Sequence, residues 1–136
     1  MKISSRIIIS LLIIFLFGNC ENDEIYSDVE GVEWTLFMEA YANCNDAARN
    51  ESYTFVCTST DCVTILFARG VITWTEKKNG IVNVNTSSTY IIIGTTMTVM
   101  DSGESTDFAI LLSGNMLTLV GPGGDPGCTE TLVMNR

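Results

Sequence analysis

From residue 32 almost to the C-terminus, apolar and polar residues alternate with a period of two. The alternating runs are rich in valine, isoleucine, threonine and aromatic residues, which favour β-strands, and short clusters of glycine, asparagine, aspartate or serine separate them. No part of this region shows the 3.6-residue period of a long helix. Residues 31–136 are therefore predicted to form one all-β domain.

We expect about eight to ten short strands with tight connections. The predicted strands span residues 32–42, 53–57, 62–69, 71–76, 81–85, 89–93, 96–100, 107–112, 116–120 and 129–134. Asn79-Gly80 is the strongest hairpin signal, because a type I′ turn needs positive φ at both central residues. Between the first two strands, residues 47–50 have room for a single helical turn.

Tight connections between successive strands predict an antiparallel meander. An open meander leaves an exposed edge strand, whereas closure into a barrel removes that edge. The predicted fold is therefore a small up-and-down antiparallel barrel. A two-sheet β-sandwich is the alternative.

The N-terminal residues resemble an export signal. Lys2 and Arg6 precede an apolar run over 7–17, which is shorter than the roughly 20 residues that span a bilayer. Residues 16–20 then resemble a bacterial lipobox, in which the cysteine, here Cys20, receives fatty acyl groups such as palmitate and becomes the first mature residue. The match departs from the preferred pattern at Phe17 and Asn19. The alternative is ordinary signal cleavage, with Cys20 left as a thiol.

Residues 20–30 are acidic and lack periodicity, so we expect a lipidated cysteine followed by a flexible tether. The acidic run over 21–24 resembles the tag that directs Bacteroidetes lipoproteins to the cell surface. Two or three acyl chains anchor a protein stably. The expected location is therefore the outer membrane, on the cell surface, with residues 1–19 removed as a signal peptide.

Removal of residues 1–19 from the 136-residue chain leaves 117 residues, with five basic side chains against 16 acidic ones and a net charge of −11. Such a charge repels nucleic acid and anionic lipid headgroups. No nucleic-acid partner is expected, and the charge does not identify a protein partner.

Apart from Cys20, the chain has four cysteines, which allow three pairings in an oxidising compartment. We favour Cys57–Cys62, because the turn over 58–61 joins two predicted strand ends, and hence Cys44–Cys128. A metal site is the disfavoured alternative, because the chain has no histidine and the Cys57–Cys62 spacing exceeds that of the usual zinc pair. No metal or other cofactor is expected.

Several short motifs carry a resemblance to a known family. They are Gly31-Val32-Glu33-Trp34-Thr35-Leu36, an early and a late cysteine, the Tyr-x-Phe and Tyr-x-Ile strands at Tyr53 and Tyr90, and the Gly-Asn-x-Leu-Thr-Leu strand over 114–119. The chain is similar to the short lipocalin-like domains of Bacteroidetes lipoproteins, which implies a lipocalin-like barrel. Lipocalins carry Gly-x-Trp, whereas this chain has one residue more. The resemblance also implies an arginine over Trp34, a role open to Arg136.

The residue types disfavour an enzyme. Without histidine, neither a Ser-His-Asp nor a Cys-His arrangement can form, and no phosphate-binding glycine loop precedes a helix. The remaining candidate is the apolar face of the strands. The side chains expected to line an apolar pocket are Trp34, Leu36, Met38, Phe55, Phe67, Trp74, Tyr90 and Phe108.

Two functions stay open. The first is a membrane-anchored, surface-exposed lipoprotein whose barrel binds a small apolar ligand. The alternative is a non-enzymatic interaction or structural lipoprotein, in which side chains fill the barrel and its loops contact a protein or a glycan. An enclosed cavity would favour the first, and a filled interior with an exposed apolar patch would favour the second.

Overall fold

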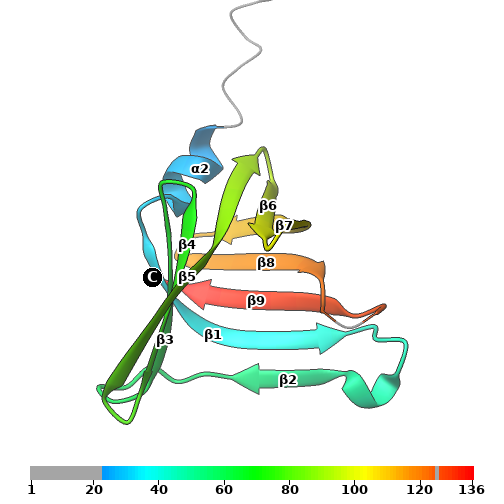
Figure 1. Cartoon of the computed structure of the whole chain (residues 1–136), viewed down its shortest axis with the longest axis horizontal. Coiled ribbons are helices and arrows are strands. Elements are labelled where there is room, and N and C mark those ends of the chain that lie inside the picture. Colours follow the sequence, from blue (N-terminus) through cyan, green and yellow to red (C-terminus); the bar gives the residue numbers. More distant parts are fainter. Residues whose placement is uncertain (1–22, 125) are drawn as a thin grey trace, which may run out of the picture.

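The computed structural model describes residues 23–124 and 126–136. Antiparallel strands dominate this part of the chain (Figure 1). The strands are β1 (Glu33–Ala42), β2 (Glu51–Thr54), β3 (Cys62–Ala68), β4 (Val71–Lys78), β5 (Ile81–Ile93), β6 (Thr96–Asp101), β7 (Glu104–Ser113), β8 (Met116–Pro122) and β9 (Thr129–Asn135). Helix α2 (Asp23–Val29) precedes β1, and the short 3-10 helix η1 (Ala47–Arg49) lies at the predicted helical turn.

The sheet closes on itself, as predicted. Strands β3 to β9 pair in sequence order, and β1 pairs with both β3 and β9, so eight antiparallel strands form a closed barrel. This closure excludes the two-sheet sandwich. Strand β2 lies outside the barrel and pairs with the second half of β1, where β3 no longer reaches it (Figure 1).

Two-residue turns connect the hairpins. Asn79 and Gly80 have φ angles of 52° and 78°, which confirms the predicted type I′ geometry. Ser102 and Gly103, with φ angles of 51° and 87°, form a similar turn between β6 and β7. These turns place successive strands side by side and keep the connections short.

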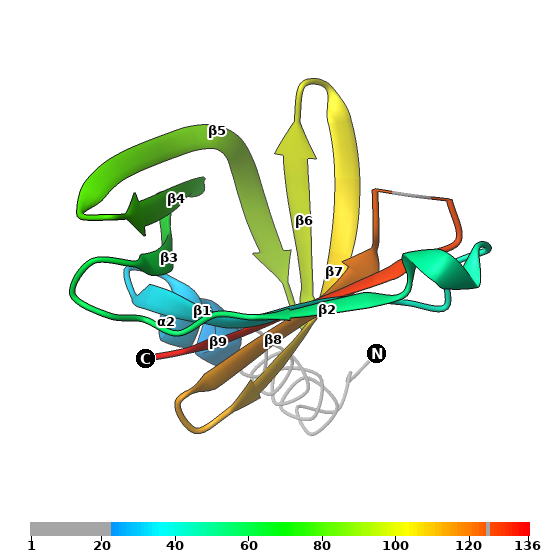
Figure 2. The same cartoon turned by 90° about the horizontal axis from the view of Figure 1, so that it is seen from below.

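Strand β5 differs from the prediction of two separate strands. It runs without interruption over Ile81–Ile93, and a register shift against β4 lies between Ile72 and Trp74. Irregularities of this kind bend a strand, and Figure 2 shows the resulting curve of β5. Its first half pairs with β4, whereas only Thr89–Ile93 pairs with β6. The β4–β5 hairpin therefore projects from the barrel.

Side chains fill one end of the barrel, which we call the closed end. Trp34, Leu36, Leu117 and Met134 are almost completely buried there. Phe67 and Tyr90 pack edge to face, with ring centroids 5.5 Å apart. Such a cluster of large apolar side chains is the main source of stability in a small domain.

Helix α2 covers the closed end, where we expected a flexible tether over 20–30. Ile25 and Val29 are four residues apart and share one face of the helix, and Val29 is fully buried against the core. The indole of Trp34 donates a 3.5 Å hydrogen bond to the carbonyl of Val29. The sequence did not predict this helix, because Ile25 and Val29 alone, among acidic residues, do not form a clear helical repeat of apolar positions. The predicted signal peptide over 1–19 and the predicted lipidation site Cys20 lie outside the described residues.

Both predicted disulfides are confirmed, Cys44–Cys128 and Cys57–Cys62. The first joins the loop after β1 to the residue before β9, and the second closes the turn before β3. The described core and both disulfides lie within residues 23–136, so a chain that begins at Glu21 keeps all of these contacts. Within the described part, no helix has the length and apolar character to cross a bilayer.

Candidate functional site

The barrel is not filled along its whole length. Beyond the closed end lies a cavity of about 180 Å³ inside the sheet. Nine of its ten lining residues are apolar, and the tenth is Ser88. The lining residues are Ile65, Phe67, Ile72, Trp74, Ser88, Met97, Val99, Phe108, Leu119 and Leu132. We call this space the apolar cavity.

The apolar cavity adjoins a larger hollow at the open end of the barrel, which we call the mouth. The mouth has a volume of about 530 Å³ and shares Ser88, Val99 and Phe108 with the cavity. Its other lining residues are Asp101, Ser102, Glu104, Thr106, Pro122, Gly123, Gly124 and Glu130. Pockets for small molecules typically hold about 300–1,000 Å³. The mouth alone reaches that size and is polar, and the cavity beside it is apolar.

A bulge in β1 decides which side chains face the mouth. Leu36 pairs with Met134, but Met38 pairs with Val133, so the register shifts by one residue between them. Because Val133 lies between two inward residues of β9, the bulge places Met38 on the outer face. Beyond the bulge, Glu39 pairs with Leu132 and Tyr41 pairs with Glu130 on the inner face.

Tyr41 lies between two carboxylates. Its hydroxyl donates to Glu39 Oε1 at 2.6 Å, and Glu130 Oε1 lies 3.2 Å from the same oxygen. Burial raises the pKa of the Glu130 carboxyl, and the negative charge of Glu39 raises it further, although the hydrogen bond from Tyr41 acts in the opposite direction. Burial and the same two carboxylates raise the pKa of the Tyr41 hydroxyl. The phenol therefore stays a neutral donor.

Gly121 opens space beside Phe108. It faces Glu130 across β8 and β9, on the inner side of the sheet. A Cβ atom at this position would lie 2.5 Å from Cδ1 of Phe108 and 2.9 Å from the carbonyl oxygen of Asp107. Only glycine lets the Phe108 ring lie against β8, where it forms part of the wall between cavity and mouth.

The predicted pocket residues fall into three groups. Phe67, Trp74 and Phe108 line the apolar cavity. Trp34, Leu36 and Tyr90 are buried at the closed end. Phe55 packs partly against the core and lines a separate hollow of about 190 Å³ beside the β4–β5 hairpin, and Met38 lies on the outer face.

Sequence reasoning missed the polar side of the mouth. Glu130, Leu132 and Met134 alternate on β9, so Glu130 shares the inward face of the strand, but only apolar side chains were predicted to line the pocket. No sequence signal was available for Glu39 and Tyr41, because the bulge in β1 reverses the faces that uninterrupted alternation predicts.

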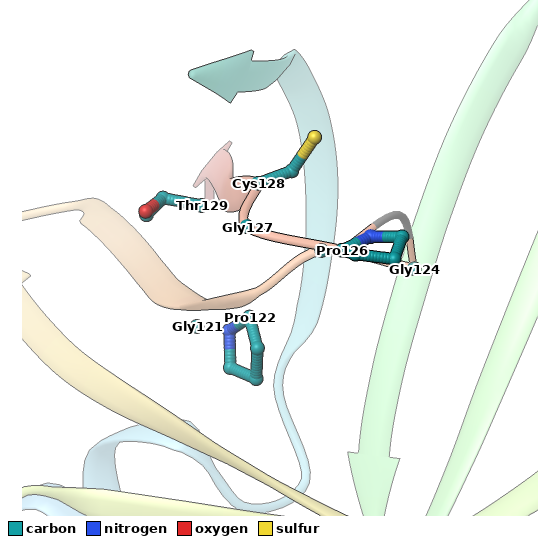
Figure 3. Close-up of a pocket in the computed structure, with 8 residues that line it drawn as sticks. Gly121, Pro122, Gly124, Pro126, Gly127, Cys128 and Thr129 are labelled. Atoms are coloured by element: carbon teal, nitrogen blue, oxygen red, sulfur yellow. The ribbon is translucent and has the colours of Figure 1, made fainter. Parts of the chain in front are cut away.

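A further hollow of about 560 Å³ lies beside the loop between β8 and β9. Figure 3 shows Pro122 at the start of this loop and Cys128 at its end. Glycine and proline make up most of the described lining, and it contains no ionisable side chain. We therefore place the candidate site in the apolar cavity and the mouth.

The described residues contain no group of three or more histidine, cysteine, aspartate or glutamate side chains placed to hold a metal ion. The chemistry that the site offers is apolar contact at its base and carboxylate oxygens at its entrance. Comparison of the chain with protein-family models and with curated proteins finds no match.

Proposed function

We propose that this chain is an exported lipoprotein, acylated on Cys20 and anchored to the outer membrane at the cell surface, whose lipocalin-like barrel binds a small molecule. The apolar part of that molecule occupies the apolar cavity. The observation that carries the proposal is the apolar cavity inside the barrel, which shares Ser88, Val99 and Phe108 with the mouth. A packed core would place side chains there, because protein interiors are close-packed.

The position of the anchor supports the same function. Helix α2 begins at Asp23 and packs on the closed end of the barrel (Figure 1). Cys20 precedes Asp23 by three residues, a reach of at most about 11 Å. The lipid would therefore attach near the closed end, and the mouth would face away from the membrane. The disulfides use the other four cysteines and leave Cys20 for acylation.

A space-filling variant tests the pocket. Val99 lines both spaces, so Val99→Phe would place an aromatic ring in the cavity. Leu111→Phe is the matched control, because Leu111 is 60% exposed. Binding of octanol, measured by calorimetry, should be lost in Val99→Phe and kept in Leu111→Phe, with both variants folded by circular dichroism. Equal binding by the two variants would contradict the proposal. Native mass spectrometry of the protein from its own host should show a bound small molecule.

One observation favours the alternative, an interaction lipoprotein. On the projecting β4–β5 hairpin, Ile81, Val82 and Val84 are all more than half exposed. Among the described strands, only β4 pairs with this half of β5, so its other edge is open to a further strand. Exposed apolar edges are sites where a partner protein adds a strand.

Lysine substitutions distinguish this alternative. Val82→Lys/Val84→Lys should remove any protein partner that binds the β5 edge, whereas Leu111→Lys leaves that edge intact. Quantitative mass spectrometry of host membrane proteins retained by each variant provides the measurement. A set of retained proteins that is the same for both variants would exclude the β5 edge as an interface.

A further inference from the structure

We infer that the molecule bound in the barrel is a cationic amphiphile, with its apolar part in the cavity and its positive charge at the mouth. This inference rests on the proposed function. It specifies the chemical class of the ligand through the side chains that surround the entrance.

The base of the site cannot hold the charge. The walls of the apolar cavity have one polar side chain, Ser88, and an ion there would lose its hydration without a charged partner. A ligand that fills the cavity must therefore keep any charged group at the mouth. The sign of that group depends on the side chains there.

Four acidic residues, which we call the acidic rim, surround the mouth: Glu39, Asp101, Glu104 and Glu130. Asp101, Glu104 and Glu130 line the mouth directly, and Glu39 is joined to Glu130 through Tyr41. Asp101 and Glu104 pair across β6 and β7, and Glu39 and Glu130 lie on β1 and β9. Neither lysine nor arginine occurs among the described residues that line the cavity or the mouth.

Three basic side chains lie in other parts of the fold. Arg136 covers Trp34 at the closed end. Lys77 and Lys78 line the separate hollow beside the β4–β5 hairpin. Because four carboxylates surround the mouth and no described basic side chain lines it, the mouth has a negative potential, which attracts cations and repels anions.

The contacts of the Tyr41 hydroxyl with Glu39 and Glu130 favour a cation at the acidic rim. One hydroxyl proton lies between Glu39 and Glu130, and the pKa of Glu130 is raised because burial and Glu39 both disfavour its negative charge. A positive group beside these carboxylates would relieve the repulsion. A neutral group would gain nothing from it, and a carboxylate would add to it.

Three probes with the same octyl chain test the inference. They are octyltrimethylammonium, whose charge does not change with pH, octanol, and octanoate. The protein is the chain from Glu21 onward, with both disulfides formed. We expect octyltrimethylammonium to bind about fivefold more tightly than octanol, as for partly exposed charge pairs, and octanoate to bind more weakly than octanol. Added salt should reduce the preference for the cation and leave octanol binding unchanged.

Matched variants connect the preference to the rim. Glu39→Gln/Glu130→Gln removes two charges at the mouth and keeps acceptors for the Tyr41 hydroxyl. Asp28→Asn/Glu33→Gln removes two charges at the closed end, where Asp28 and Glu33 are exposed. The mouth variant should bind octanol like the wild type and lose the preference for the cation. The closed-end variant should keep both the octanol affinity and the preference for the cation.

The outcomes separate the two proposals. Equal binding of all three probes, lost in Val99→Phe, would overturn the cationic ligand and leave the apolar site standing. Tighter binding of octanoate than of octyltrimethylammonium would also overturn the cationic ligand and leave the apolar site standing. If no probe binds, the apolar site fails and the inference fails with it. A cation preference that survives in the mouth variant would overturn the role of Glu39 and Glu130.

Discussion

The guanidinium of Arg136 lies over the ring of Trp34, 5.2 Å from its centroid. Its Nη1 also donates a 3.1 Å hydrogen bond to the carbonyl oxygen of Asp28 in α2. Arg136 therefore joins the end of β9 to Trp34 near the start of β1 and to the helix that covers the closed end. The sequence resemblance had implied an arginine over Trp34, and Arg136 occupies that position.

Arg136→Ala should destabilise the barrel by about 1–2 kcal/mol, because it removes one cation–π contact and one hydrogen bond from a charged donor. Arg136→Lys keeps the charge but loses the planar group, so its free energy of unfolding should lie between those of the wild type and Arg136→Ala. Urea unfolding of the chain from Glu21 onward provides the measurement. A free energy of unfolding for Arg136→Ala that equals that of the wild type would show that the contact contributes nothing.

The two disulfides should differ in their contribution to stability. Their cysteines are separated by 84 and 5 residues. In the chain-entropy description, the longer closure contributes about 4.5 kcal/mol and the shorter about 2 kcal/mol. Cys44→Ser/Cys128→Ser should therefore lower the urea midpoint more than Cys57→Ser/Cys62→Ser. The reverse order would mean that strain or residual structure in the unfolded chain outweighs loop entropy.

Gly121→Ala should cost about 1–3 kcal/mol, because the added methyl group overlaps the Phe108 ring and the backbone at Asp107. The double variant Gly121→Ala/Phe108→Leu should recover part of this loss, since the smaller side chain frees space for the methyl group. A double-mutant cycle by urea unfolding measures the coupling energy between the two positions. Strict additivity would show that the clash with the backbone alone determines the cost.

The alternation of residues located nearly every strand, because an inward apolar face and an outward polar face are imposed by burial itself. It could not locate the bulge in β1, which depends on pairing with β9 rather than on local composition. Helix α2 was missed because Ile25 and Val29 acquire their role only against the closed end of the barrel. The apolar half of the site was accordingly predictable in part, through Phe67, Trp74 and Phe108, while the rim at Glu39 and Tyr41 was not.

The Glu130 carboxyl should make stability depend on pH in a defined direction. Its pKa in the folded chain is raised above the ordinary value of 4.5, so the folded state holds this proton more tightly than the unfolded state. The free energy of unfolding that this group contributes is therefore fully present below pH 4.5 and is lost as the pH rises through the raised pKa. Glu130→Gln, which cannot ionise, should keep that contribution.

Urea unfolding over a range of pH measures the difference in stability between Glu130→Gln and the wild type. The difference should grow in favour of the variant as the pH rises above 4.5 and then level off. Glu39 and Tyr41 face Glu130 from β1, and Asp101 and Glu104 share the mouth with it, but these four side chains are the same in both proteins. Glu33→Gln, at an exposed position on β1, is the matched control. A difference that shrinks with rising pH would mean that Tyr41 stabilises the Glu130 charge more than burial and Glu39 oppose it.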